Sequence, residues 1–296
     1  ESPLSDQIIL RVGDPPRPGA MSRDDLRRYE PRVTDALCGP FLVYVVCVPP
    51  PPSSGVALLQ MLAILDRTDI ARRGPDDPQA WFLFAEASRL MYADRDTYVG
   101  DADFVKVPVA GMIEPAYLDQ RAALIGKTAA ATVEPGKPKG AGVAIADRTL
   151  EPAGTSHFVI VDAAGNAVSM TTTIESVFGS GRMAAGFFLN NELTDFSLAP
   201  LRADGAPAAN AVAAGKRPRS SMSPVLILDR EGRLVGALGS PGGPSILAYN
   251  ARALIAVLDW GVPVQTAFNL PNLVARGDGF GADTERFSEA LRAGLA

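Results

Sequence analysis

Apolar and polar residues alternate most regularly in the middle of the chain, where the pattern predicts a β-hairpin. Residues 155–162 read TSHFVIVD, and residues 167–174 form a second extended run. An Ala-Gly-Asn segment at 164–166 separates the two runs, and Gly and Asn tolerate the positive φ angles of tight turns. We therefore expect a strand, a turn and a second strand, with Thr155 opening the first strand directly after Gly154.

Helical and extended patterns flank this hairpin on both sides. Apolar positions at helical spacing predict helices over residues 56–65, 79–98 and 245–258. Extended apolar runs predict strands over residues 8–12, 224–229 and 234–238, and two strands within residues 33–48 separated by Gly39-Pro40. Residues 127–153 are rich in Gly, Pro, Ala and Lys, which predicts a flexible linker leading to Thr155.

Polar residues mark the ends of two predicted helices. Ser22 is placed to cap a short helix that begins at Arg23. Asp94, Arg95 and Asp96 lie near the end of the helix over residues 79–98, and we expect a solvated ion-pair cluster there.

Composition excludes several classes of protein. The chain has 296 residues, 47% of them apolar, which is enough for a packed core. A formal net charge of −5 leaves no basic footprint for nucleic acid. No apolar run approaches the roughly 18 residues of a membrane span, and the first ten residues lack the features of a signal peptide.

Histidine and cysteine are too scarce for a zinc site or a Ser-His-Asp triad. The chain has one histidine, His157, and two cysteines, Cys38 and Cys47, without ligand spacing. We expect no metal and no cofactor, and interpret His157 as a supporting strand residue. The cysteines are equally compatible with a disulfide and with two free thiols.

Thr155 is a candidate nucleophile, because a threonine at the start of a chain can supply its own base. Its hydroxyl is weakly nucleophilic at neutral pH, but a free α-amino group titrates near pH 8 and can accept the proton. The Gly154-Thr155 bond would have to be cut first. Glycine at 154 leaves its carbonyl sterically open to the Thr155 hydroxyl.

Other polar residues after the hairpin suit a polar substrate, although each has a purely structural alternative. Thr171 and Thr173 share one strand face, where threonine is also common for its β-propensity. Glu192 and Asp195 could bind a cation or could lie at a helix N-terminus.

Two further pairs offer hydrogen-bond donors. Ser220 and Ser221 could donate to a carboxylate or could form a turn before a strand. Gly242 and Gly243 lie at a predicted strand-to-helix turn, where free backbone N–H groups can hold an oxyanion or a phosphate. No lysine follows them as a phosphate loop would require.

Six motifs in one order resemble the γ-glutamyltranspeptidases, or glutathione hydrolases. They are PPPPSSG at 49–55, ADRDTYVGDADFVKVP at 93–108, GTSHFVIVD at 154–162, LNNELTDFS at 189–197, RPRSSMSP at 217–224 and GSPGGPS at 239–245. Together they span roughly residues 19–275, and six matches in family order make a chance resemblance improbable.

The resemblance implies an α+β fold, a four-layer αββα sandwich of the N-terminal-nucleophile hydrolases. It implies self-cleavage at Gly154-Thr155 into a large-subunit region, residues 1–154, and a small-subunit region, residues 155–296. The two regions would form one structural domain and remain together as a heterodimer. A lid is expected at residues 198–216.

The resemblance also implies a role for each candidate residue. Catalysis would use Thr155, Thr173, which hydrogen-bonds the nucleophile, and the Gly242 and Gly243 amides as the oxyanion hole. Substrate would be bound by Glu175, Glu192, Asp195, Ser220 and Ser221, the acids holding the α-ammonium group and the serines the α-carboxylate. The partners would be a γ-glutamyl compound such as glutathione, with water or an amino acid as acceptor.

Three departures from the family pattern leave alternatives open. Glu175 stands where much of the family has an asparagine. The helical region before residue 19 that carries the family's carboxylate-binding arginine is reduced, and the final strands look short. A glutaryl or cephalosporin acylase of the same fold and a non-catalytic truncated homologue are therefore alternatives. The family resemblance favours a periplasmic or secreted protein, with a cytoplasmic location as the alternative.

Overall fold

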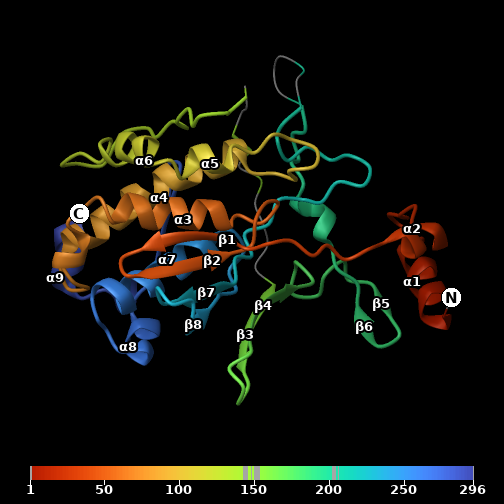
Figure 1. Cartoon of the computed structure of the whole chain (residues 1–296). Coiled ribbons are helices and arrows are strands. Elements are labelled where there is room, and N and C mark those ends of the chain that lie inside the picture. Colours follow the sequence, from red (N-terminus) through yellow and green to blue (C-terminus); the bar gives the residue numbers. More distant parts are fainter. Residues whose placement is uncertain are drawn as a thin grey trace.

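Helices and short strands alternate along the chain and form a mixed α/β fold (Figure 1). The computed structural model describes residues 2–142, 146–147, 149, 154–201, 205 and 207–295. The α-helices are α1 (Pro3–Val12), α2 (Arg23–Arg28), α3 (Gly55–Leu65), α4 (Pro78–Tyr98), α5 (Val109–Met112), α6 (Pro115–Ala122), α7 (Ile246–Leu254), α8 (Val264–Asn269) and α9 (Glu289–Leu295). The strands are β1 (Leu37–Phe41), β2 (Tyr44–Val48), β3 (Thr155–Val161), β4 (Ala167–Thr173), β5 (Met183–Ala184), β6 (Phe187–Phe188), β7 (Val225–Leu228), β8 (Leu234–Leu238), β9 (Leu273–Arg276) and β10 (Gly279–Ala282).

A four-stranded antiparallel sheet in the order β1-β2-β7-β8 lies at the centre of the body. The side chains of α3, α4 and α7 pack with the buried side chains of this sheet, among them Val46 and Ile227, which are register partners. The segment GVALLQMLAIL of α3 is apolar on nearly all sides, so this helix is buried along nearly its whole length. The three helices and the sheet therefore share one core.

The predicted hairpin is confirmed and projects from this body (Figure 1). β3 and β4 are antiparallel, with Thr155 opposite Thr173 and Val161 opposite Ala167. The hairpin contacts the sheet through β8, where the Ser169 hydroxyl donates to the Leu238 carbonyl at 3.2 Å. Its base therefore lies beside the end of β8, close to the glycine pair that follows this strand.

The predicted strand over residues 8–12 is wrong, because these residues belong to helix α1. Pro3 occupies the first turn, where its fixed φ suits a helix and its missing N–H costs nothing. The Ser5 hydroxyl also accepts a hydrogen bond from the Ser2 amide. These start signals outweigh a short apolar run. The predicted cap Ser22 is confirmed, since its hydroxyl accepts from the Asp25 amide at the start of α2.

The prediction that Gly39-Pro40 separates two strands is also wrong. Both residues lie within β1, and the turn to β2 falls at residues 42–43. Pro40 is tolerated because β1 is an edge strand of the sheet. With this register Cys38 lies opposite Cys47, and the two form a disulfide. The pairing of the strands thus decides between the two thiol states that the sequence left open.

The helix expected over residues 245–258 begins one residue late and changes character before its end. α7 ends at Leu254, and residues Ile255–Asp259 form a π-helix. Of the predicted linker, residues 143–145, 148 and 150–153 lie outside the described residues, as do 202–204 and 206 of the predicted lid. Among the described residues, no helix combines the length and apolar character needed to cross a membrane.

The predicted solvated cluster at the end of α4 is in fact buried. Asp94, Arg95 and Asp96 are all at most 3% exposed. Asp94 accepts hydrogen bonds from Gln60 and Tyr117 at 2.6 and 2.7 Å, and Arg95 pairs with Asp96 at 3.0 Å. Burial of a charge is tolerated only with such partners. The partners of Asp94 come from α3 and α6, so the sequence of α4 alone could not reveal this burial.

Candidate active site

The two threonines proposed for catalysis face one another across the base of the hairpin. Thr155 and Thr173 are direct register partners on β3 and β4. The Thr155 hydroxyl donates to the Thr173 hydroxyl at 3.2 Å, and the Thr173 hydroxyl accepts from the Glu175 amide at 2.8 Å. Thr173 is thereby fixed in the position from which it can orient the hydroxyl of Thr155.

Gly154 lies in close contact with the segment that follows β4. A Cβ atom at this position would come within 2.2 Å of the Glu175 carbonyl oxygen, a distance that real Cβ atoms do not adopt. Packing therefore requires glycine at 154. This packing depends on the segment that follows β4, so it could not be predicted from the local sequence.

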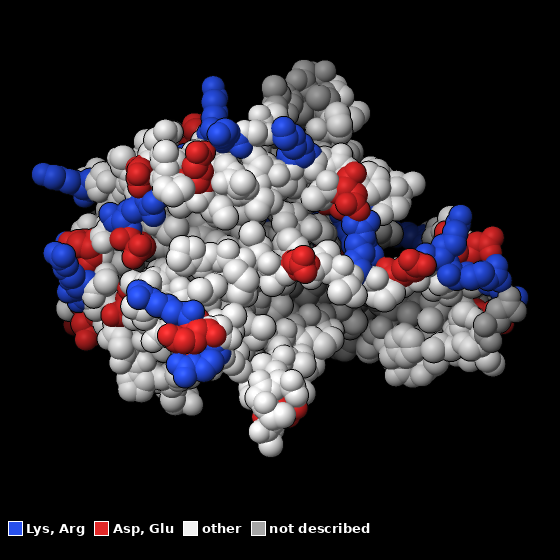
Figure 2. Space-filling view, in the orientation of Figure 1, with Lys and Arg blue, Asp and Glu red and all other residues white. Residues whose placement is uncertain are grey.

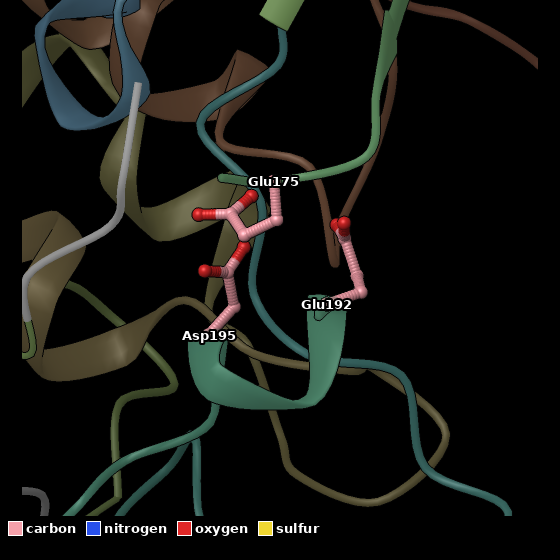
Figure 3. Close-up of side chains that lie close together, drawn as sticks. All are labelled: Glu175, Glu192 and Asp195. Carbon is pink, nitrogen blue, oxygen red and sulfur yellow. The ribbon is translucent and has the colours of Figure 1, made fainter. Parts of the chain in front are cut away.

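Three carboxylates converge beside the threonines (Figure 3). Glu175 follows β4, whereas Glu192 and Asp195 come from the 3₁₀ turn Glu192–Asp195, and oxygen atoms of the three lie within 4.8 Å of one another. Glu175 and Asp195 are each 4% exposed. Three negative charges this close and this buried favour a cation between them, such as a substrate ammonium group or a metal ion.

The backbone of Glu175 has a conformation that is unusual for a residue with a side chain. Its φ angle is +75°, in the left-handed region. Such a conformation costs about 1–3 kcal/mol and persists only where surrounding contacts hold it. The hydrogen bond from the Glu175 amide to Thr173 is one of these contacts. The strained turn brings the Glu175 carboxylate to the other two acids.

Ser220 and Ser221 lie beside the threonines and the carboxylates, and the loop that precedes α3 holds them there. The Ser54 amide donates to the Ser220 carbonyl at 2.8 Å, and the Ser220 hydroxyl accepts from the Met222 amide at 3.1 Å. Ser221 is 3% exposed. The PPPPSSG motif thus supports the serine pair directly, which explains why two segments so distant in sequence belong to one site.

Arg95 is the residue of this region that sequence reasoning missed. Its guanidinium is fully buried and donates to the Ser54 hydroxyl at 3.0 Å and to the Ser221 hydroxyl at 2.5 Å. The segment Ala93-Asp94-Arg95 lies within one of the six motifs and could have indicated a functional arginine. The sequence of α4 alone, however, predicts that this arginine is exposed. Arg95 places a positive charge directly behind one of the two serines.

The glycine pair after β8 forms a tight turn into helix α7. Gly242 and Gly243 have φ angles of +134° and +54°, which side-chain-bearing residues rarely adopt. The ring of Tyr249 also packs so closely on Gly242 that a Cβ atom there would lie 2.8 Å from it. The turn leads through the 3₁₀ residues Gly243–Ser245 into α7.

His157 supports this turn from β3, the strand that begins with Thr155. Its Nδ1 atom lies 2.9 Å from the Thr171 hydroxyl, and its ring packs against Gly239, where a Cβ atom would lie 2.3 Å away. Burial lowers the pKa of His157 below its ordinary value of 6.5. The residue is therefore neutral at pH 7 and acts through contact with the loop that leads to Gly242.

Seven of the nine predicted site residues line one small cavity. They are Thr155, Thr173, Glu175, Asp195, Ser220, Ser221 and Gly243. Glu192 joins through the carboxylate cluster, and Gly242 is the chain neighbour of Gly243. The cavity measures about 10 Å³, enough for about one water molecule, so its walls must separate to admit a larger group.

This constellation occurs in a chain whose residues 3–296 match the family model described as Gamma-glutamyltranspeptidase. The chain belongs to the γ-glutamyltranspeptidase family. The Glutathione hydrolase proenzyme of Bacillus subtilis (strain 168) is 36% identical over 270 residues, which cover 86% of this chain and 44% of that protein. The motif resemblance is thereby confirmed.

The proteins that are similar to this chain also include acylases. The Acylase ACY 1 proenzyme of Pseudomonas sp. (strain V22) is 36% identical over 262 residues, 88% of this chain and 44% of that protein. The crystal structure of cephalosporin acylase from Bacillus halodurans superimposes with a TM-score of 0.81 over 99% of this chain and 50% of that chain, at 23% identity. The mixed α/β fold is thus shared. This chain spans less than half the length of the two curated relatives.

Proposed function

We propose that this chain carries the catalytic centre of a γ-glutamyl hydrolase or transferase that uses Thr155 as its nucleophile. The convergence of seven predicted residues on one cavity, in a chain of this family, supports the proposal most directly. The residues come from β3, β4, two loops, the 3₁₀ turn Glu192–Asp195 and the turn before α7, so their meeting is a property of the fold. It does not follow from nearness in sequence.

The first step of the proposed mechanism creates the base. The Thr155 hydroxyl attacks the Gly154 carbonyl carbon, the peptide C–N bond breaks, and an ester forms between the two residues. Water then hydrolyses the ester and leaves a carboxylate on Gly154 and a free amine on Thr155. Residues 1–154 and 155–296 would remain associated as large and small subunits of one four-layer αββα domain.

The second step transfers the γ-glutamyl group. The Thr155 amine accepts the proton of the Thr155 hydroxyl as its oxygen attacks the γ-amide carbon. The amides of Gly242 and Gly243 would stabilise the oxyanion, and loss of one such donor typically raises a barrier by about 3 kcal/mol. The leaving amine takes the proton. Water or an amino acid then resolves the γ-glutamyl ester and restores Thr155.

Charge favours a γ-glutamyl substrate over other amides. A γ-glutamyl group carries an α-ammonium group, which the carboxylates of Glu175, Glu192 and Asp195 can pair with. Ser220 and Ser221 would donate to its α-carboxylate, with the buried Arg95 charge behind Ser221 adding to the attraction. A glutaryl group lacks the ammonium group and could not form this pairing.

An acylase is the second candidate, favoured by the Pseudomonas relative. The substrate preference separates the two candidates. We propose a periplasmic or secreted location, which the Cys38–Cys47 disulfide supports because disulfides persist in oxidising compartments.

A processing and activity assay tests the proposal. The purified chain of 31.1 kDa is expected to yield two fragments, the second beginning with Thr155 by mass spectrometry, and to hydrolyse γ-glutamyl anilide faster than glutaryl anilide. Thr155→Ala should abolish both processing and hydrolysis. Thr172→Ala is the matched control, because Thr172 lies on the opposite, exposed face of β4, and it should preserve both.

Two results would overturn the proposal. Turnover of γ-glutamyl anilide by Thr155→Ala would exclude this residue as the nucleophile. A chain that hydrolyses the anilide while its Gly154-Thr155 bond stays intact would exclude the activating amine. Faster hydrolysis of glutaryl anilide would instead select the acylase.

A further inference from the structure

A second and larger cavity is lined by residues from the end of β8 and the loop after it, from α7 and α8, and from the residue before β9. Its volume is about 300 Å³, at the lower end of the range for small-molecule sites. The lining comprises Leu238, Gly239, Ser240, Pro241, Tyr249, Asn250, Arg252, Ala253, Phe268 and Asn272. It shares no lining residue with the cavity at Thr155.

The charged group in this lining is Arg252, and it is almost completely buried. The side chain is on α7, and the residue is 5% exposed. Its Nη1 atom donates to the Ala267 carbonyl, while its Nε atom is enclosed and has no hydrogen-bond partner. Arg252 forms no salt bridge with any described carboxylate.

The neighbouring charges do not neutralise Arg252. Asp283 acts on it at longer range but accepts hydrogen bonds from Asn272 and lies 3.8 Å from Arg286. Burial and the nearby Arg286 together lower the pKa of Arg252. A guanidinium nevertheless stays protonated in proteins, so the cavity holds a buried positive charge whose solvation by water has been lost.

The rest of the lining suits an apolar body attached to an anion. Leu238, Ala253 and the aromatic ring of Phe268 provide apolar wall, and Tyr249 separates the cavity from Gly242. A buried cation without an ion-pair partner is costly, and a carboxylate that pairs with a guanidinium recovers that cost through charge-assisted hydrogen bonds. We propose that this cavity binds a small organic carboxylate, with its anionic group at Arg252 and its apolar part against Phe268.

This site is independent of the chemistry proposed for Thr155. It requires only the packing of α7 against β8 and α8. Its ligand would nevertheless contact the Gly239-Ser240-Pro241 segment that leads to the glycine pair.

Calorimetric titration with benzoate tests the proposal, with benzamide as the uncharged probe of the same shape. The natural chain should bind benzoate saturably and benzamide at least tenfold more weakly. Arg252→Gln should weaken benzoate binding roughly 10- to 100-fold, the range for loss of charged hydrogen bonds, and leave benzamide nearly unchanged. Arg286→Gln is the matched control, because Arg286 is half exposed and already paired, and it should preserve tight benzoate binding.

A variant at the mouth of the cavity provides a second test that does not alter the core. Phe268 is 50% exposed, so Phe268→Glu should fold. It should weaken both probes through the loss of the aromatic wall, and benzoate more than benzamide, because the new carboxylate repels the anion. Equal affinities for the two probes would overturn the proposal, as would unchanged benzoate binding in either Arg252→Gln or Phe268→Glu.

Discussion

Single residues in this protein act mainly through what packs against them. Glycine at 154 is required because the Glu175 carbonyl occupies the space of a side chain. Arg95 stands behind Ser221 because α4 is buried at its last turn. His157 is neutral because its ring is enclosed between Thr171 and Gly239. In each case the residue type was visible in the sequence, but its environment was not.

We predict that the ring of His157 titrates below pH 6.5 in the folded chain. Burial lowers the pKa of His157 below 6.5 in the folded chain, so between the two pKa values the unfolded chain binds more protons. The contribution of this residue to stability is therefore complete above pH 6.5 and is lost as the pH falls toward the folded-state pKa. Because the chain has one histidine, its ring proton signals in an NMR titration are unambiguous. A midpoint at or above 6.5 would contradict the burial of the ring.

A contact between β3 and the loop after β8 helps to hold the hairpin beside the glycine pair. β3 carries both Thr155 and His157, and the His157 ring fits against Gly239 directly after β8. Strand alternation places these two side chains on the same face of β3, so the ring sets the distance between β3 and the loop of the glycine pair. The hairpin was predictable from alternation and turn residues. Its docking partner was not, because pairing between distant segments leaves no local pattern.

Substitution of Gly239 tests this contact. Gly239→Ala places a methyl group within 2.3 Å of the His157 ring and should lower the free energy of unfolding by about 1–3 kcal/mol, as overpacking does. Removing the ring in Gly239→Ala/His157→Ala should cost less than the sum of the two single changes, because the clash is gone. Urea unfolding of the four proteins measures the difference.

Gly281→Ala is the control for the loss of a glycine, since a methyl group there meets no atom within 4 Å. It should leave the unfolding midpoint nearly unchanged. Strict additivity of the Gly239 and His157 substitutions would show that the two residues do not touch.

At the scale of the whole molecule, the projecting hairpin exposes apolar side chains on both faces. Phe158, Val159, Ile160 and Val161 on β3 and Val168 and Met170 on β4 are each at least 40% exposed. In Figure 2 this projection is almost entirely white, and its few charged atoms lie near its tip. Apolar surface with free strand edges promotes association between chains. The curated relatives that match this chain have more than twice its matched length, so they contain polypeptide that could cover such a surface.

Exchange of one exposed cross-strand pair tests the association of this surface. Ile160 and Val168 are register partners, 57% and 49% exposed. The double variant Ile160→Lys/Val168→Glu keeps a favourable cross-strand pair and should lower the average mass of the protein at high concentration. Light scattering behind size-exclusion chromatography measures this mass. Val33→Thr, at a position 97% exposed outside the hairpin, should not change it. Coincident mass curves for the double variant and the natural chain would exclude the hairpin as the associating surface.

The sequence by itself determined the hairpin, helices α3 and α4, the family and the identity of the candidate site residues, because periodicity, turn residues and ordered motifs are local properties. It failed for residues 8–12, where helix-start signals outweigh an apolar run, and for Gly39-Pro40, where an edge strand accommodates proline. Only the tertiary structure decided the Cys38–Cys47 pairing, the burial of Arg95 and the cavity at Arg252. The physical reason is that strand register, desolvation and enclosed volume depend on which distant segments pack together.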